Sequence, residues 1–146
     1  MEFIVSIAPN SVLRAAPRPR RERANFTSCL INASTVMVAA GGEVDACNAH
    51  ELAEYVECSL EASTRLVVDL RDLQFFGTQG FSTLHKINVT CSGSAVNWVV
   101  IPGREVDRLL RICDPGGGLP VATTLETAVA AVVQGPRSHL RMIPRS

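Results

Sequence analysis

Two short runs of apolar and β-branched residues, FTSCLI and TVMVAA, stand near the start of the chain with the turn-like NAS between them. They predict a β-hairpin. The glycines of GGEVD then predict the end of the second strand, and Asp45 can cap a helix over about residues 46–61. The apolar residues of that helix recur every three or four positions, as on a half-buried helix: Ala49, Leu52, Ala53, Val56 and Leu60.

The next apolar run, RLVVDL, is continuous, which is typical of a strand that helices cover on both faces. A helical stripe follows in GFSTLHKINVTC, then a strand in AVNWVVI and a second helical stripe in GREVDRLLRIC. The segment PVATT predicts a short fifth strand. Thr123 with Glu126 forms a capping box for a last helix that reaches about Val133.

These elements alternate in the order β-β-α-β-α-β-α-β-α, which predicts an α/β fold with a mixed β-sheet. One domain is expected over residues 26–134. Residues 1–25 form a basic extension rich in proline and arginine, with too few apolar side chains to build a core. Residues 135–146 are expected to be a loose tail.

Charge and composition exclude several classes of protein. No apolar run approaches the roughly 20 residues that span a bilayer, so a membrane protein is not expected. An acid precedes the N-terminal apolar patch and the basic residues follow it, the reverse of a secretory signal, which favours a cytoplasmic location. Residues 27–136 hold six basic side chains against twelve acidic ones, so we expect no nucleic-acid partner.

The five cysteines are odd in number and contain no C-x-x-C pair, so neither a disulfide framework nor a zinc site is indicated. Cys47 and His50 lie one helical turn apart but have no further ligands nearby, and we expect no metal or cofactor. The simplest interpretation is five small core residues. A redox role for one pair, such as Cys91 and Cys113, stays open.

A threonine between glycines, Thr78 in FFGTQG, follows the continuous strand. A P-loop would need a lysine that neither GTQGFS nor GGGLPVATT supplies, and a dinucleotide fingerprint would need three glycines. The hydrolase elbow would need a glycine where Phe76 stands. The three histidines have no evident acid partner. We therefore expect the protein not to be an enzyme.

The position of Thr78 gives it two roles. If the second helix begins at Gln79, Thr78 is its N-cap and its oxygen accepts from the amide of Gly80 or Phe81. A hydroxyl at the positive end of a helix is also a favourable place for a phosphate, whose charge of about −2 the unpaired amides stabilise. The residues alone leave both roles open.

Three ordered motifs resemble the STAS domain, the module of bacterial anti-sigma factor antagonists and of sulfate transporter tails. They are VMVAAGGEVDACNAHEL, RLVVDLRDLQFFGTQGFSTL and TTLETAVAAV, within about residues 26–134. The resemblance implies a mixed sheet backed by about four helices. In the antagonist branch it implies a serine or threonine, at the start of the second helix, that a partner anti-sigma factor phosphorylates as a serine/threonine kinase.

Carried over by position, the resemblance makes Thr78 the phosphoacceptor and Gly80 the motif glycine. It makes Asp69 the acid that ends the preceding strand, beside the acceptor. The turn from Glu43 to Asp45 matches the family loop that lies beside the acceptor and contacts the partner.

The chain departs from the family pattern on both sides of the acceptor. Gly77 stands where the family has aspartate, and Gln79 where it has serine or threonine, so a carboxylate beside the acceptor is missing. The residues expected to contact the partner are Glu43, Asp45, Asp69, Gly77, Gln79 and Gly80.

The leading hypothesis is therefore an anti-sigma factor antagonist that binds an anti-sigma factor of the kinase type and so releases a sigma factor, with Thr78 as the switch. The alternative is an interaction module of the same fold that lacks the phospho-switch and responds to cysteine redox state or another signal. The sequence leaves the oligomeric state open, a homodimer included.

Overall fold

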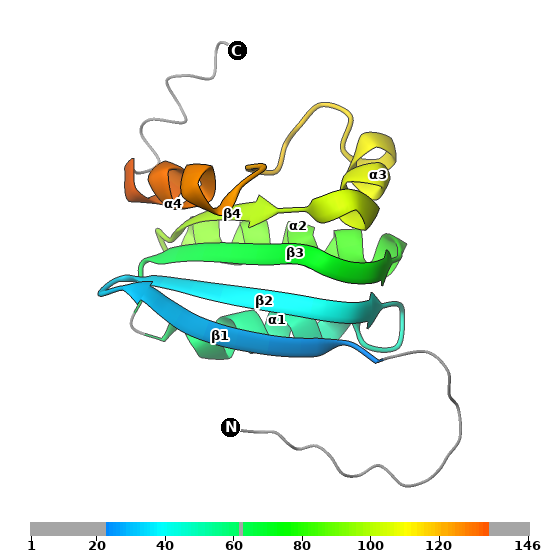
Figure 1. Ribbon diagram of the computed structural model, residues 1–146, viewed down its shortest axis with the longest axis horizontal. Helices are drawn as coiled ribbons and strands as arrows, with labels where there is room; N and C mark the ends of the chain where they lie inside the picture. Colours follow the sequence, from blue (N-terminus) through cyan, green and yellow to red (C-terminus); the bar gives the residue numbers. More distant parts are fainter. Residues whose placement is uncertain (1–22, 62, 135–146) are drawn as a thin grey trace, which may run out of the picture.

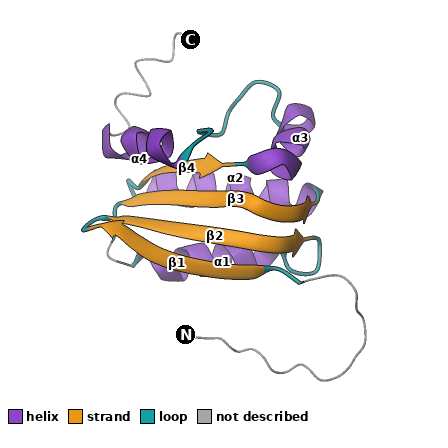
Figure 2. Cartoon of the chain, viewed as in Figure 1, coloured by secondary structure: helices purple, strands orange, loops and turns teal. Residues whose placement is uncertain are grey.

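The computed structural model describes residues 23–61 and 63–134, and in them one mixed sheet has the strand order β1-β2-β3-β4 (Figure 1). β1 is antiparallel to β2, whereas β2, β3 and β4 are parallel to one another. The strands and helices, coloured by type in Figure 2, are β1 Asn25–Asn32, β2 Thr35–Val44, α1 Ala49–Leu60, β3 Arg65–Phe76, α2 Thr78–Gly93, β4 Asn97–Ile101, α3 Gly103–Cys113 and α4 Leu125–Gln134. The predicted α/β class, a mixed sheet with about four helices, is confirmed.

Helices cover the two faces of the sheet unequally. α1 and α2 lie behind the sheet in Figure 1, and their apolar stripes pack against alternate residues of β2, β3 and β4. α4 packs on the opposite face through Ala128 and Val132, against Val67, Val99 and Ile101. Alternate side chains of a strand point to opposite faces, so the run RLVVDL buries both of its faces, as predicted.

The hairpin is confirmed, but its second strand does not end at the glycines. β2 continues through Gly41 and Gly42 to Val44, because β3 pairs with it along this whole stretch. Gly42 has φ +84°, and a Cβ there would lie 2.3 Å from the carbonyl oxygen of Arg23. Glycine is therefore required by the close approach of the incoming chain rather than by a turn.

The starts of two helices differ from prediction by the position of their caps. α1 begins at Ala49 with Asn48 as its N-cap, so the prediction that Asp45 caps this helix is wrong. α4 begins at Leu125, and its capping box joins Thr124 to Thr127: the Thr127 amide donates to Thr124 Oγ1 over 3.1 Å and the Thr124 amide to Thr127 Oγ1 over 3.3 Å. The predicted box at Thr123 is thus one residue early.

The predicted fifth strand is reduced to a single bridge, in which Val121 pairs with Val100 of β4. The preceding glycine loop is held by Asp114, whose carboxylate accepts from the amides of Gly118 and Leu119 at 2.9 and 3.1 Å. After this loop the backbone makes only that short contact with the sheet before α4 begins.

The cysteines are not five core residues as predicted. Cys91 is buried, Cys113 is half-buried, and Cys29, Cys47 and Cys58 are exposed. Within residues 23–61 and 63–134, no helix is long and apolar enough to cross a membrane. Residues 1–22 of the predicted extension 1–25 and the predicted tail, 135–146, lie outside the described residues, whereas Asn25 already belongs to β1.

Candidate functional site

The candidate site lies where β2 and β3 end, because parallel strands bring their carboxyl ends to the same edge of the sheet. The amide of Gly77 donates to the carbonyl of Val44 over 3.0 Å. This bond joins the β2–α1 loop, with Glu43 and Asp45 beside it, to the β3–α2 loop that carries Thr78. Two of the predicted motifs, GGEVD and GTQG, therefore meet at one end of the sheet.

The β2–α1 loop is braced by Asn48, a residue that the sequence analysis did not single out. Asn48 Oδ1 accepts from the Asp45 amide and its Nδ2 donates to the Glu43 carbonyl, both over 2.9 Å. The carboxylate of Asp45 accepts from the Cys47 amide at 2.9 Å. Asn48 is 6% exposed, so its two bonds are partly shielded from water and hold the loop's shape.

Thr78 is the first residue of α2 rather than its N-cap. Gly77 is the N-cap, with extended φ and ψ of −89° and −179°, and it has no side chain to bond the first turn. The Gly80 amide instead donates to the Gly77 carbonyl over 2.8 Å. Thr78 and Gln79 are exposed, and the first turn of α2 holds no acid. The hydroxyl is thus open to solvent at the positive end of the helix dipole.

Two contacts hold the start of α2 in place. A Cβ at Gly80 would lie 2.6 Å from ring atoms of Phe76, so only glycine lets the helix approach the end of β3 this closely. One turn further on, the Thr83 hydroxyl donates to the Ala49 carbonyl over 3.1 Å in a buried position. The beginnings of α1 and α2 are therefore fixed to each other.

Phe75 is a second residue that the sequence analysis missed. It pairs with Glu43 across β2 and β3, lies next to Gly77, and leaves 42% of its surface exposed. A large exposed aromatic side chain beside polar residues is a typical anchor of a protein interface. We call the exposed or half-exposed residues at this end of the sheet the Thr78 surface: Glu43, Asp45, Phe75, Gly77, Thr78 and Gln79.

Asp69 does not belong to this surface, and the expectation that it ends the strand beside Thr78 is wrong. β3 continues for seven more residues to Phe76, which at about 3.3 Å per residue places Asp69 roughly 20 Å from the strand's end. Asp69 instead binds Arg71 through two bonds of 2.9 Å. Partial burial opposes its ionisation, but the hydrogen bonds and charge of Arg71 outweigh burial and lower the pKa of Asp69.

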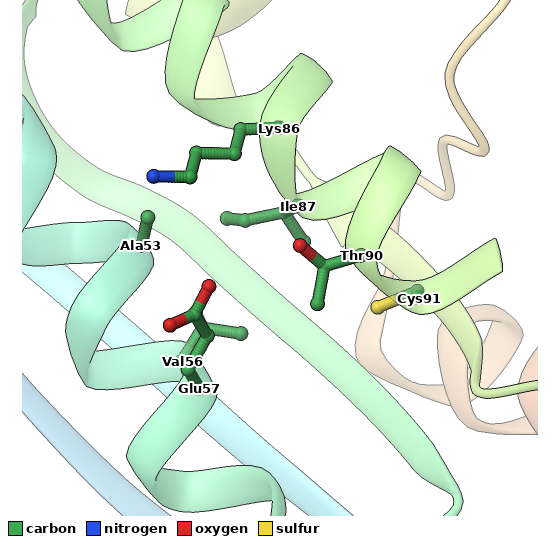
Figure 3. A pocket seen from close by; sticks show the side chains of 7 residues that line it. All are labelled: Ala53, Val56, Glu57, Lys86, Ile87, Thr90 and Cys91. Atoms are coloured by element: carbon green, nitrogen blue, oxygen red, sulfur yellow. The ribbon is translucent and has the colours of Figure 1, made fainter. Parts of the chain in front are cut away.

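The cysteines considered for a redox role lie away from the Thr78 surface. Cys91 closes one end of the seam between α1 and α2, where Glu57 and Lys86 extend into the same gap from the two helices (Figure 3). The seam is too narrow to hold a water molecule. Burial raises the pKa of the Cys91 thiol to about 12, which opposes formation of a reactive thiolate. Cys113 lies half-buried at the end of α3.

The four-stranded mixed sheet, the two joined loops and the exposed threonine at the start of α2 define the class of fold in which this chain falls. Residues 29–128 match the family model of the STAS domain. The chain belongs to the STAS domain family.

Two proteins of Mycobacterium tuberculosis are similar to this chain in sequence. Anti-sigma-F factor antagonist RsfA of Mycobacterium tuberculosis is 34% identical over 102 residues, which are 67% of this chain and 80% of that protein. Osmosensory protein A of the same species is 30% identical over 76 residues, 51% of this chain and 48% of that protein.

Two solved structures share the fold. An anti-sigma factor antagonist from Mycobacterium paratuberculosis superposes with a TM-score of 0.68 at 21% identity, over 76% of this chain and 95% of that chain. The anti-sigma factor antagonist SpoIIAA in its unphosphorylated form superposes with a TM-score of 0.62 at 17% identity, over 75% of this chain and 97% of that chain. At these identities the likeness extends to the fold alone.

Proposed function

We propose that this chain is an anti-sigma factor antagonist that acts by binding and not by catalysis. In this proposal the Thr78 surface contacts an anti-sigma factor of the serine/threonine kinase type, and binding releases the sigma factor that the kinase holds. The observation that carries the proposal is the 3.0 Å bond between Gly77 and Val44, because it presents the exposed threonine and the Glu43–Asp45 loop as one surface. The relationship to RsfA supports the class of partner.

Phosphorylation of Thr78 is the proposed switch. The first turn of α2 supplies amides and a positive dipole end, which stabilise a phosphate. The same phosphate would add a charge of about −2 next to a loop that already carries two carboxylates. A partner that fits the unmodified surface would then have to desolvate this added charge, so the complex weakens without any change of fold.

The lack of the family aspartate at position 77 restricts which kinases can recognise this chain. Gly77 has no carboxylate, and a Cβ there would lie 3.3 Å from the ring of Phe75. The glycine therefore lets Phe75 lie against the loop backbone, and an aromatic ring occupies space beside the acceptor. We propose that the cognate kinase recognises this ring in place of the carboxylate.

Intact-mass spectrometry tests the switch. The full chain is incubated with ATP and each anti-sigma factor kinase of its source organism, next to Thr78→Ala and to Ser82→Ala, a control that removes an exposed hydroxyl one turn further along α2. We expect one phosphate on the wild type and on Ser82→Ala, and none on Thr78→Ala. Phosphate on all three proteins would place the acceptor elsewhere.

Binding is measured separately, so that the partner and the switch are tested independently. Titration calorimetry with the same kinases should give equal affinity for the wild type and Thr78→Ala, and a weaker complex for Thr78→Glu. Tight binding without phosphate transfer would retain the antagonist and discard the switch. No binding to any kinase of this class would overturn the proposal.

The alternative, a module of the same fold without the phospho-switch, predicts tight binding that responds to another signal. The burial of Cys91 argues against its thiol as that signal, since the charged form is disfavoured. Measuring the affinity with and without peroxide distinguishes a redox-gated module from the phospho-switch, because the phospho-switch leaves the unmodified protein insensitive to oxidant.

A further inference from the structure

The two edges of the sheet are protected to very different extents. At β4, the backbone of residues 120–122 blocks the edge: the Val100 amide donates to the Pro120 carbonyl and the Ala122 amide to the Val100 carbonyl, both over 2.9 Å. At β1, in the described part of the chain, no backbone pairs with the side that faces away from β2. An unpaired strand edge presents donors and acceptors to any strand that fits it.

The sequence of β1 lacks the features that usually prevent such pairing. Asn25–Asn32 reads NFTSCLIN, eight residues without a charge, a proline or a glycine. Six of the eight are exposed, and Leu30 leaves 67% of its surface in contact with solvent. The only irregularity in its pairing with β2 lies at the far end, between Leu30 and Asn32.

We propose that β1 is a self-association edge, through which two copies of this chain join their sheets into one continuous sheet of eight strands. A two-fold axis perpendicular to the sheet places the two β1 strands antiparallel and closes the assembly at a dimer. A second copy suits this edge because the body of the protein is acidic, whereas β1 is neutral. Two copies therefore meet here with little charge repulsion.

The alternation of side chains and the positions of the apolar residues together select the register. Phe26 packs toward α1, with its ring centre 5.5 Å from that of Tyr55, so Ser28 and Leu30 share this face of β1. Under the two-fold axis, residues directly opposite each other must face the same side. An axis through Ser28 meets this condition and sets Leu30 opposite Phe26 of the second copy, and Phe26 opposite its Leu30.

This register accounts for the exposed leucine. Opposite side chains on antiparallel strands lie about 5 Å apart, which is contact distance for an aromatic and an aliphatic group. An axis through Cys29 would instead set Leu30 opposite Ser28 and Phe26 opposite Asn32, leaving both apolar groups beside polar ones. One pair of short strands buries less surface than a standard interface of roughly 1,600 Å². The dimer should therefore dissociate on dilution.

Sedimentation of the full chain over a dilution series tests the assembly. We expect the wild type to pass from twice the chain mass to 15.7 kDa as it is diluted. Leu30→Lys should stay at 15.7 kDa throughout, because it buries a charge in the pairing. The control Ile112→Lys changes an equally exposed apolar residue on α3, 73% exposed, and should keep the dimer.

Disulfide cross-linking tests the register. In a chain whose exposed cysteines are replaced (Cys29→Ser, Cys47→Ser, Cys58→Ser), Ser28→Cys lies opposite itself, within the 4.4–6.8 Å that a disulfide spans between Cα atoms. Asn25→Cys, exposed on the same strand, is offset from its copy by roughly 20 Å and serves as the control. We expect a covalent dimer from Ser28→Cys alone. Equal cross-linking of both variants, a wild type that is monomeric at every dilution, or a dimer that survives Leu30→Lys would overturn the proposal.

Discussion

The α-carbon of Gly80 faces the ring of Phe76 so closely that any larger residue would displace one of them: an added Cβ would lie 2.6 Å from two of the ring atoms. Phe76 is the last residue of β3 and is 5% exposed, so its ring cannot turn away into solvent. The start of α2, and with it Thr78, is therefore positioned by a glycine.

Gly80→Ala should lower the free energy of unfolding by about 1–3 kcal/mol, the usual cost of adding a methyl group to a filled core. Gly93→Ala on the same helix is the matched control, because a Cβ there meets nothing within 4 Å. The control should leave stability unchanged or raise it slightly, since alanine restricts the unfolded chain. Urea unfolding measures both; equal effects would mean that the Phe76 contact does not set the helix position.

Thr35→Val should stabilise the protein. Thr35 is fully buried, and among the described residues its hydroxyl oxygen has no hydrogen-bond partner, so the folded state carries a desolvation cost that valine lacks. We expect a gain of about 1 kcal/mol in the free energy of unfolding. Thr83→Val, which removes the buried bond to the Ala49 carbonyl, should lose about as much. A loss from both substitutions would mean that Thr35 has a partner.

Asp69→Asn should destabilise the protein at neutral pH and have a smaller effect in acid. The pKa of Asp69 is lowered in the folded state, so its contribution is present above the unfolded value near 3.9 and disappears as pH falls through the folded value. The pair is open to solvent on the arginine side, so we expect less than about 1 kcal/mol. The difference between the urea midpoints of wild type and variant should be full at pH 7 and shrink as the pH falls below about 3.9. A gap that persists in acid would assign the effect to packing.

Phe75→Ala should weaken binding of the anti-sigma factor by at least tenfold and leave stability almost unchanged. The expectation rests on the proposed function and on the exposed ring of Phe75 within the Thr78 surface. Val89→Ala on α2 is the control, because Val89 is a comparably exposed apolar residue outside that surface. Calorimetry with the partner measures both variants. Unchanged affinity for Phe75→Ala would show that the ring lies outside the interface.

Cys91 should resist alkylation in the folded protein. Its pKa of about 12 leaves roughly one thiol in 10,000 ionised at pH 8, and the side chain is buried. Iodoacetamide should therefore label the exposed cysteines first and reach Cys91 only in urea. Mass spectrometry of Cys91→Ala should show one label fewer in urea and the same number without it. Early labelling of Cys91 would reopen a redox role for this thiol.

The hairpin and the helical stripes could be predicted from sequence because they follow the periods of a strand and a helix. The apolar residues Leu84, Ile87 and Cys91 lie buried on one face of α2, as their spacing predicts. The ends of the strands were harder to predict from the sequence. Glycines normally weaken a strand, yet Gly41 and Gly42 stay in β2 because pairing with β3 outweighs local preference.

The candidate site could be predicted only in part from the sequence. Glu43, Asp45 and Thr78 come together because their motifs end adjacent parallel strands. Asp69 was misplaced because Arg71 and Asp72 interrupt the apolar run, although β3 continues beyond them to Phe76. The exposure of Phe75 could not be predicted from the sequence, because an aromatic residue at the end of a strand is ordinarily expected to be buried. It depends on the place of Phe75 in the sheet, opposite Glu43 of β2.

The chain enters and leaves the domain at opposite ends of the sheet. Arg23 bridges Glu43, next to the Thr78 surface, whereas the end of α4 lies near the start of β4, where the Asn97 side chain donates to the Val132 carbonyl over 3.0 Å (Figure 1). A fluorescent reporter fused upstream of Arg23 would therefore emerge beside the surface that the partner must reach and compete with it for space. The same reporter placed after Gln134 would sit at the other end and leave that surface free for measurement in living cells.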